Sequence, residues 1–119
     1  MSSKMLQWVA GAHKEYAQLP KSVQQEFGHA LWLAQKGDKA AFAKPLKGFG
    51  GADVIELKND RSGEAYRAIY TVRFGDAVYV LAAIHKKSTK GIGFTQKDAE
   101  LIRKRLQQAK QDYDRRNPP

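Results

Sequence analysis

The chain has 119 residues and a net charge of +9, which suit one basic domain spanning residues 1–119 and leave no room for two. It has no cysteine and its three histidines lie far apart, so disulfides and thiolate metal sites are excluded and no metal or other cofactor is expected. No apolar run approaches the roughly 20 residues that cross a bilayer, and no signal-peptide stretch is present, so we expect no membrane contact and a cytoplasmic location.

The first third of the chain predicts one short strand and two helices. Lys4 to Val9 favours an edge strand, and a helix is expected from Gly11, or already from Met5, to about Leu19. A longer helix follows Pro20, since proline suits a first helical turn, and Gly37 ends it. Its apolar face has helical spacing and consists of Val23, Phe27, Ala30, Leu31 and Ala34.

The middle of the chain predicts a small antiparallel sheet. Residues 44–51 are rich in glycine and are expected to form an irregular loop. Strands are expected at 52–58, 65–74 and 77–86, with a polar turn at 59–63 between the first two. Gly75-Asp76 favours a two-residue type II′ turn, because glycine adopts the positive φ that this turn requires. Three strands joined in this way form a meander.

The Gly75-Asp76 turn sets the register of the last two strands. It pairs Tyr66 with His85, Arg67 with Ile84 and Tyr70 with Leu81. Two sets of residues then share opposite faces, namely Tyr66, Tyr70, Val72, Tyr79 and Leu81 on one and Ile69, Val80 and Ile84 on the other. Both faces are apolar in mid-strand, so the sheet is expected to be covered on both sides.

A helix is expected at the C-terminal end. Thr95 is a suitable N-cap, and Asp98 three residues later completes an approximate capping box. The helix should run to about Asp114, with residues 115–119 frayed and the run Arg103-Lys104-Arg105 on a solvated face. Its apolar stripe comprises Ala99, Ile102, Leu106, Ala109 and Tyr113. The order of elements predicts an α+β fold with N-terminal helices packed on the sheet and a C-terminal helix.

The positive charge is concentrated in the last part of the chain. Residues 71–119 contain eleven lysines and arginines against five acidic residues. Residues 85–90 form a basic burst directly after the apolar run 77–84, and no acidic residue occurs between Asp76 and Asp98, so these cations cannot all be neutralised locally. Such a surface favours a polyanion with phosphate groups, although a solubilising loop is the alternative interpretation.

The predicted register brings several cations to one end of the sheet. Arg67 and Lys86 fall on the same face as diagonal neighbours, and Lys58 or Glu56 should reach this end from the adjacent strand. Guanidinium and ammonium groups bind a phosphodiester, and RNA can be cleaved without a metal through its own 2′-hydroxyl. His85 is a candidate proton carrier, although this register points it to the opposite face.

Several short segments match a known pattern in order and spacing: 44–49, 55–58, 63–70, 79–81, 86–90 and 100–103. Together they resemble the RelE/ParE toxin superfamily, and most closely the phage-derived, HigB-like toxins of bacterial toxin–antitoxin systems. The resemblance covers about residues 5–113. It implies a RelE-like fold and a metal-independent endoribonuclease that cuts mRNA on the ribosome. It also implies a neighbouring antitoxin, expected to be a HigA-like helix-turn-helix protein.

Residue by residue, the resemblance assigns Arg67 to the scissile phosphate and Lys86 or Lys87 to the cationic position after the last strand. With Lys58 and His85, these are the candidate catalytic residues. Four further cations are candidates for RNA binding: Lys44, Lys47, Lys90 and Arg103.

The chain also departs from the family pattern. Glu56 and Val54 stand where classical RelE members carry lysines, Ala82 where many relatives carry histidine, and Phe94 near the position of a tyrosine. Whether Tyr113 replaces that tyrosine is open at this point. Two alternatives therefore accompany the ribonuclease: a ParE-like gyrase poison and a catalytically degenerate binding module of the same fold.

Overall fold

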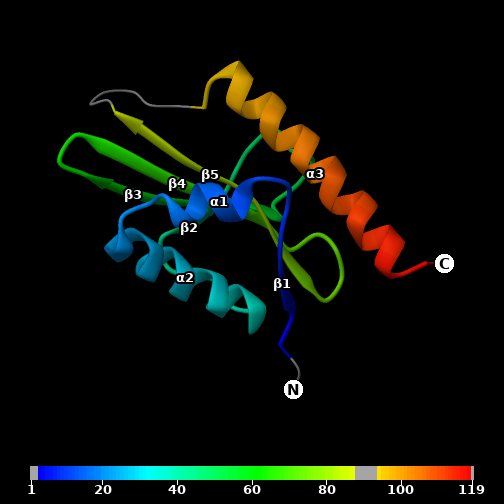
Figure 1. Ribbon diagram of the computed structural model, residues 1–119. Coiled ribbons are helices and arrows are strands. Elements are labelled where there is room, and N and C mark those ends of the chain that lie inside the picture. Colours follow the sequence, from blue (N-terminus) through cyan, green and yellow to red (C-terminus); the bar gives the residue numbers. More distant parts are fainter. Residues whose placement is uncertain (1–2, 88–93, 119) are drawn as a thin grey trace.

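The computed structural model describes residues 3–87 and 94–118 and has the predicted α+β architecture (Figure 1). A five-stranded sheet has the order β1-β5-β4-β3-β2. Helices α1 (Ala12–Ala17) and α2 (Lys21–Gln35) pack on one face, and α3 (Gln96–Arg116) packs on the other. The strands are β1 (Met5–Trp8), β2 (Ala43–Pro45), β3 (Val54–Arg61), β4 (Glu64–Thr71) and β5 (Ala77–Lys87).

The sheet is mixed and has two strands more than the predicted meander. β2, β3, β4 and β5 are antiparallel, whereas the predicted edge strand β1 runs parallel to β5, with Met5 beside Ala77. The segment that was expected to be wholly irregular contributes β2, which pairs with β3. Its Pro45 lacks an N–H group and is tolerated because β2 lies at the sheet edge.

The β3–β4 hairpin is longer than predicted. Its turn consists of Ser62 and Gly63, both with positive φ, as in a two-residue type I′ turn. The polar residues that were assigned to the turn belong to β3 instead, because α2 offers them partners. The Asn59 side-chain amide donates to a Glu26 carboxylate oxygen at 2.8 Å, and an Arg61 Nη1 donates to the Ser22 hydroxyl at 2.9 Å.

The register between β4 and β5 is confirmed at one end and wrong at the other. Tyr66 pairs with His85 as predicted, but a β-bulge follows Ile69, and Tyr70 pairs with Val80 instead of Leu81. A slip of one residue reverses the face of every later side chain. Tyr79 and Leu81 therefore pack with Ile69 on the α3 side, and Val80 packs with Tyr70 on the α2 side. Helices cover both faces, as expected.

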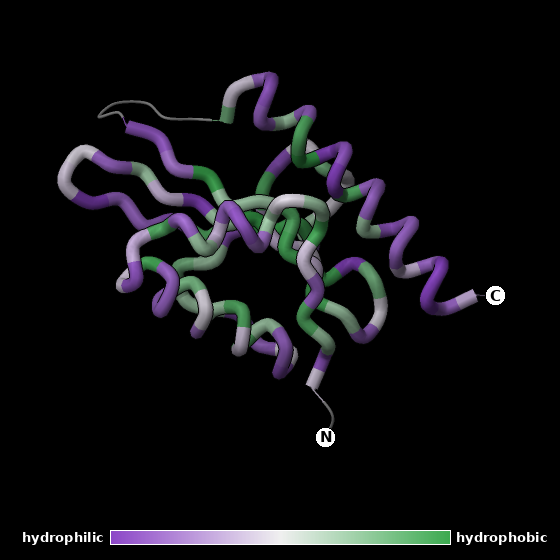
Figure 2. The backbone as a smooth tube through the Cα atoms, viewed as in Figure 1, coloured by the Kyte–Doolittle hydropathy of each residue, from purple (hydrophilic) through white to green (hydrophobic). Residues whose placement is uncertain are grey.

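The two long helices follow their predicted patterns. All five apolar residues assigned to α2 are buried, and Pro20 is its N-cap rather than its first helical residue. In α3, the Thr95 hydroxyl accepts from Asp98 N at 3.1 Å and the Asp98 carboxylate accepts from Thr95 N at 3.0 Å, which completes the predicted capping box. The predicted fraying from residue 115 is wrong, because Arg115 and Arg116 are helical and pair with Asp112. Figure 2 shows the hydrophobic residues gathered along the middle of the sheet, with hydrophilic residues along α3 and at the strand ends.

Gly75 is required at the β4–β5 turn for two reasons. Its φ is +55°, and an added Cβ would overlap the Tyr113 hydroxyl from α3. We expect Gly75→Ala to lower the free energy of unfolding by about 2 kcal/mol, measured by urea denaturation. Gly37→Ala is the matched control, since Gly37 also has a positive φ but no heavy atom lies within 4 Å of an added Cβ. Equal losses for the two variants would show that Tyr113 is irrelevant to this requirement.

Candidate active site

Charged side chains from three adjacent strands share one end of the α3-side face. Lys58 on β3 lies opposite Arg67 on β4, and Arg67 lies opposite Ile84, two residues before Lys86 on β5. The predicted placement of these three cations on one face is therefore confirmed. Because side chains alternate along a strand, Glu56 and Asp60 of β3 share this face with Lys58. These five residues (Glu56, Lys58, Asp60, Arg67 and Lys86) are called the charged cluster below.

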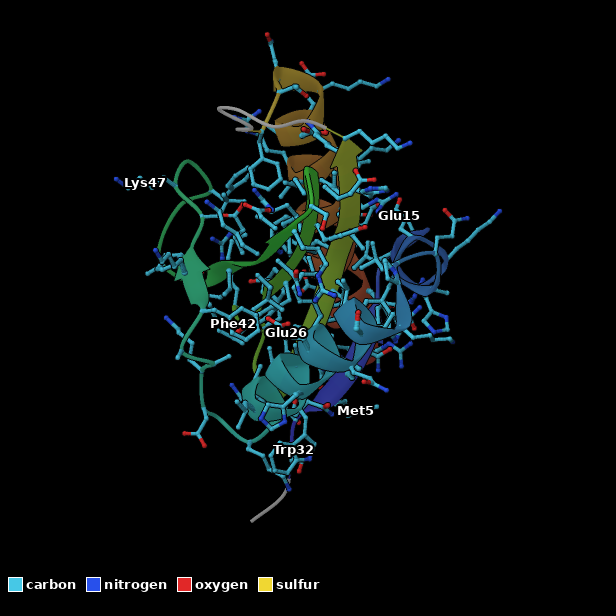
Figure 3. All side chains as sticks on the ribbon, turned by 90° about the vertical axis from the view of Figure 1, so that its left-hand side faces the viewer. Met5, Glu15, Glu26, Trp32, Phe42 and Lys47 are labelled. Carbon is cyan, nitrogen blue, oxygen red and sulfur yellow. The ribbon has the colours of Figure 1, made fainter. Side chains whose placement is uncertain are left out.

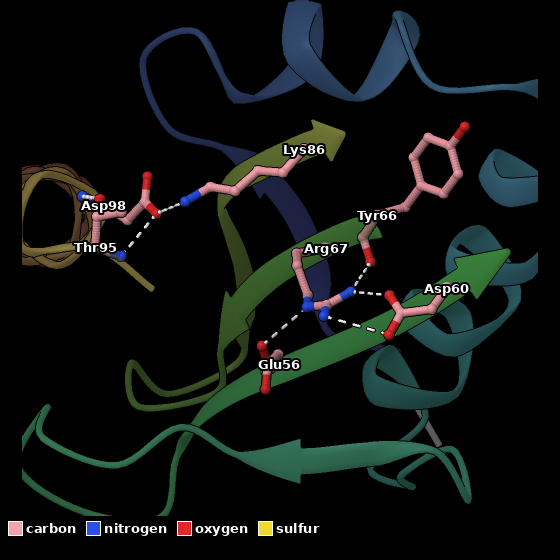
Figure 4. Close-up of polar contacts among 7 residues, drawn as sticks. All are labelled: Glu56, Asp60, Tyr66, Arg67, Lys86, Thr95 and Asp98. Atoms are coloured by element: carbon pink, nitrogen blue, oxygen red, sulfur yellow. Dashed lines mark hydrogen bonds and ion pairs between the residues drawn. The ribbon is translucent and has the colours of Figure 1, made fainter. Parts of the chain in front are cut away.

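Arg67 is the buried centre of the charged cluster, with only 6% of its surface exposed. One Nη donates to an Asp60 carboxylate oxygen at 2.5 Å and to the Tyr66 carbonyl at 2.9 Å, and the other Nη donates to Asp60 at 3.5 Å. The Arg67 Nε lies 3.4 Å from Glu56 Oε2 (Figure 4). To bind a phosphate, the guanidinium must therefore exchange one of these carboxylates for it. Asp60 is the natural one to leave, since 60% of its side chain is exposed.

Lys86 is engaged by an acidic residue that the sequence places twelve positions later. Its ammonium group pairs with the Asp98 carboxylate at the start of α3, and Figure 4 shows it directed away from Arg67. Lys86 is therefore one cation of the basic burst that is neutralised, because folding brings the first turn of α3 to the end of β5. Burial opposes the charge on Asp98, but hydrogen bonds from Lys86 and Thr95 hold its pKa below the usual range.

Glu56 is a carboxyl group of the charged cluster whose pKa is shifted from its ordinary value. Its side chain is only 12% exposed, and burial raises its pKa even though Lys58 and Arg67 act in the opposite direction. A mostly buried carboxyl group with a raised pKa, surrounded by cations, suits acid–base chemistry. The sequence placed Lys58 or Glu56 at this end of the sheet, but it gave Glu56 no chemical role and counted it as a departure from a family pattern. Strand alternation could have found it, since it places Glu56 diagonal to Arg67.

His85 and Lys87 lie on the other face of the sheet. The His85 ring stacks on Tyr66 with 4.7 Å between ring centroids, and its Nε2 lies 3.2 Å from a Glu64 carboxylate oxygen. Lys87 pairs with Glu64 in the register and is exposed. The geometry therefore does not bring these two candidates to the charged cluster.

The candidate RNA-binding cations that the structure describes are exposed and come from β2, the segment after it and α3. Lys44 on β2 pairs with Glu56 in the register and is exposed. Lys47 is exposed after β2 and is directed away from the body of the protein (Figure 3). Arg103 on α3 is exposed and its guanidinium lies 5.5 Å from the centre of the Phe49 ring. Lys90 lies outside the described residues.

The positions that depart from the family pattern are mainly structural. Val54 and Ala82 are fully buried, and Phe94 packs against the α3-side core. Tyr113 contacts Gly75, at the end of β5 opposite Lys86, so it does not take the place of the missing tyrosine. Within residues 3–87 and 94–118, no three histidine or acidic side chains lie close enough to hold a metal ion. In the same ranges, no helix is both long and apolar enough to span a membrane.

Comparison with known proteins agrees with this geometry. Residues 14–107 match the family described as "Phage derived protein Gp49-like (DUF891)". The fold is similar to a double-arginine mutant of the E. coli toxin RelE in the free state, with TM-score 0.57 and 18% identity over 88% of this chain and 96% of that chain. It is also similar to the isolated E. coli RelE toxin, with TM-score 0.55 and 20% identity over 86% of this chain and 98% of that chain. No curated protein sequence matches the chain.

Proposed function

The chain belongs to the phage-derived Gp49-like family of RelE-superfamily toxins, and on that premise we propose that it is a metal-independent endoribonuclease that cleaves mRNA. The observation that carries this proposal is the contact between Glu56, a carboxyl group with a raised pKa, and the Arg67 guanidinium. This pair combines a proton acceptor with a phosphate ligand. Ribonuclease cleavage through the 2′-hydroxyl requires both within one site.

Each member of the charged cluster has a part in the proposed reaction. Glu56 accepts the proton of the 2′-hydroxyl, whose oxygen bonds to the adjacent phosphorus. Arg67 moves from Asp60 to a phosphate oxygen and, with Lys58, stabilises the charge that develops there. The bond from phosphorus to the 5′ oxygen then breaks, and that oxygen takes a proton from Lys86 or water. The products are a 2′,3′-cyclic phosphate and a free 5′-hydroxyl. We assign no step to His85 or Lys87.

The substrate and partner follow from the same surface. The four candidate cations named from the sequence (Lys44, Lys47, Lys90 and Arg103) would hold the mRNA or ribosomal RNA backbone, since lysine and arginine side chains bind phosphates regardless of sequence. We propose a HigA-like helix-turn-helix antitoxin as the cognate partner and the ribosome, in the cytoplasm, as the place of action.

Induced expression in a bacterial host is the direct test. We expect growth arrest within one doubling time and new mRNA 5′ ends inside coding regions, mapped by primer extension. Growth arrest with intact transcripts would contradict the ribonuclease. Loss of supercoiling activity when purified gyrase is incubated with the purified protein would then support a gyrase poison.

One observation favours the degenerate binding module as the second candidate. Arg67 is almost fully buried, and its guanidinium already contacts Asp60 and Glu56. If the Arg67 guanidinium cannot leave Asp60, the protein would bind RNA without cutting it. In that case the purified parent is expected to bind RNA without cleaving it, and Asp60→Asn, which loosens this pair, is expected to gain cleavage because it releases the Arg67 guanidinium.

A further inference from the structure

A groove of about 480 Å³ lies beside α3, beyond the charged cluster. It is formed by the loop before β3, the turn after β4 and the outer side of α3. Its main lining residues are Phe49, Arg73, Phe74, Arg103, Leu106 and Lys110. The family assignment and the proposed cleavage reaction leave this groove without a role.

The groove has a preformed aromatic floor. The Phe74 ring packs edge-on against Tyr79 and in parallel against Tyr113, with ring centroids 6.0 and 5.9 Å apart. The Phe49 carbonyl accepts a hydrogen bond from an Arg73 Nη at 2.5 Å, and the Phe49 ring lies under Arg103. Because both rings are already held by neighbours, a flat ligand would bind here with little ordering cost.

The rim of the groove is cationic. None of its lining residues is acidic, and Arg103 has no ion pair within the described ranges. Lys110 pairs with Asp114 in an exposed i,i+4 contact that is worth little and can exchange with another anion. Arg73 is bound to Asp53 and serves mainly to hold Phe49. An anionic ligand with an aromatic group therefore fits this groove.

The groove lies on the same side of the sheet as the charged cluster. Phe49 and Val54 belong to the same buried cluster on the α3 side, and Val54 is two residues from Glu56 on the same face of β3, about 7 Å away. An RNA strand held at Glu56 could thus reach the groove with a nearby nucleotide. This shared side of the sheet and the cationic rim favour RNA as the occupant.

We infer that the groove binds the base of a nucleotide near the cut, stacked on the half-buried Phe74 beside the buried Phe49, with Arg103 and Lys110 on its phosphates. The inference rests on the proposed function, because it takes single-stranded RNA as the substrate. Aromatic residues stack with every base, so the groove would contribute affinity and register more than sequence preference.

Binding can be tested separately from cleavage with a 12-nucleotide RNA carrying 2′-O-methyl groups, which has no attacking hydroxyl. Affinity is measured by fluorescence anisotropy over a salt series. Arg103→Ala should weaken binding about tenfold and reduce the salt slope by about 0.7, the value for one phosphate contact on a single strand. Phe74→Leu should weaken binding about fivefold or more without changing the slope. Lys104→Ala removes an equal charge from the next, exposed position of α3 and should stay within twofold of the parent.

A second readout identifies the contact directly. 5-Iodouridine is placed at each position of the same RNA in turn and photo-crosslinked, and the modified residue is found by mass spectrometry. We expect crosslinks at Phe49 or Phe74 from a single position. The inference would be overturned if Arg103→Ala and Phe74→Leu both bound the RNA as tightly as the parent. It would also be overturned if the two variants bound an acidic leucine-rich peptide more weakly than the parent but bound the RNA unchanged. If the parent protein crosslinks at these residues but does not cleave unmodified RNA, the proposed ribonuclease activity is wrong and the inference about the groove still holds.

Discussion

Replacing Glu56 with glutamine is expected to lower the rate of RNA cleavage by at least about 100-fold, because the variant keeps the shape of the side chain and loses the proton acceptor. The Arg67 guanidinium keeps an oxygen neighbour, so the fold and the RNA affinity should change little. Single-turnover cleavage of a model mRNA, with affinity for the 2′-O-methyl RNA measured in parallel, separates the chemical step from binding.

The pH dependence of RNA cleavage tests the same role of Glu56. Burial raises the pKa of Glu56, and a general base acts only when ionised. Cleavage by the parent should therefore increase as pH rises through this raised pKa and level off above it. The rising limb should lie above the pH at which an ordinary glutamate ionises, near 4.3, and it should be absent from Glu56→Gln. Glu100→Gln, an exposed change on α3, is the control. A Glu56→Gln variant with parental rate and pH profile would remove Glu56 from the mechanism.

Replacing Arg105 with alanine is expected to lower the free energy of unfolding by about 3 kcal/mol, since it leaves a partly buried carboxylate without its partner. Arg105 is 8% exposed and joins α3 to α1 and β5. Its two Nη groups donate to the Glu15 carboxylate at 2.7 and 2.8 Å, and one of them also donates to the Leu81 carbonyl at 3.0 Å. Glu15 in turn accepts from the Ala83 amide at 3.2 Å.

Urea denaturation of the purified variants measures this effect. Lys104→Ala, the exposed neighbour of Arg105, should stay within about 0.5 kcal/mol of the parent. The double variant Glu15→Gln with Arg105→Met should recover part of the loss, because no unpaired charge remains. If Arg105→Ala were as stable as Lys104→Ala, the Arg105–Glu15 contact would contribute nothing to holding α3 on the sheet.

Arg105 and Glu56 also show what could not be predicted from the sequence. Arg105 was expected on a solvated face because it follows two other cations, yet its position, three residues after the buried Ile102, turns it inward. Glu56 was placed at the cationic end of the sheet as the alternative to Lys58, but its burial was not predicted. In both cases a partner from another element permits the burial of a charged side chain.

Local patterns were sufficient for much of the architecture. The apolar spacing of α2, the Thr95–Asp98 cap and the β4–β5 turn each depend on residues close together in the chain, so their outcome could be predicted. The strand period of two likewise placed Arg67, Lys58 and Lys86 on one face. These features require only backbone geometry and the burial of apolar side chains.

The tertiary structure alone decided the bulge after Ile69, the parallel strand β1 and the partners of the cations. Asp60 and Glu56 reach Arg67 across a strand pair, and Asp98 reaches Lys86 from the first turn of α3. Ion pairs of this kind depend on which side chains the completed fold brings within about 4 Å, because the Coulomb attraction competes with water at any longer distance. The sequence determined which charges the site contains, and the packing of α3 against the sheet determined which of them are free to meet a phosphate.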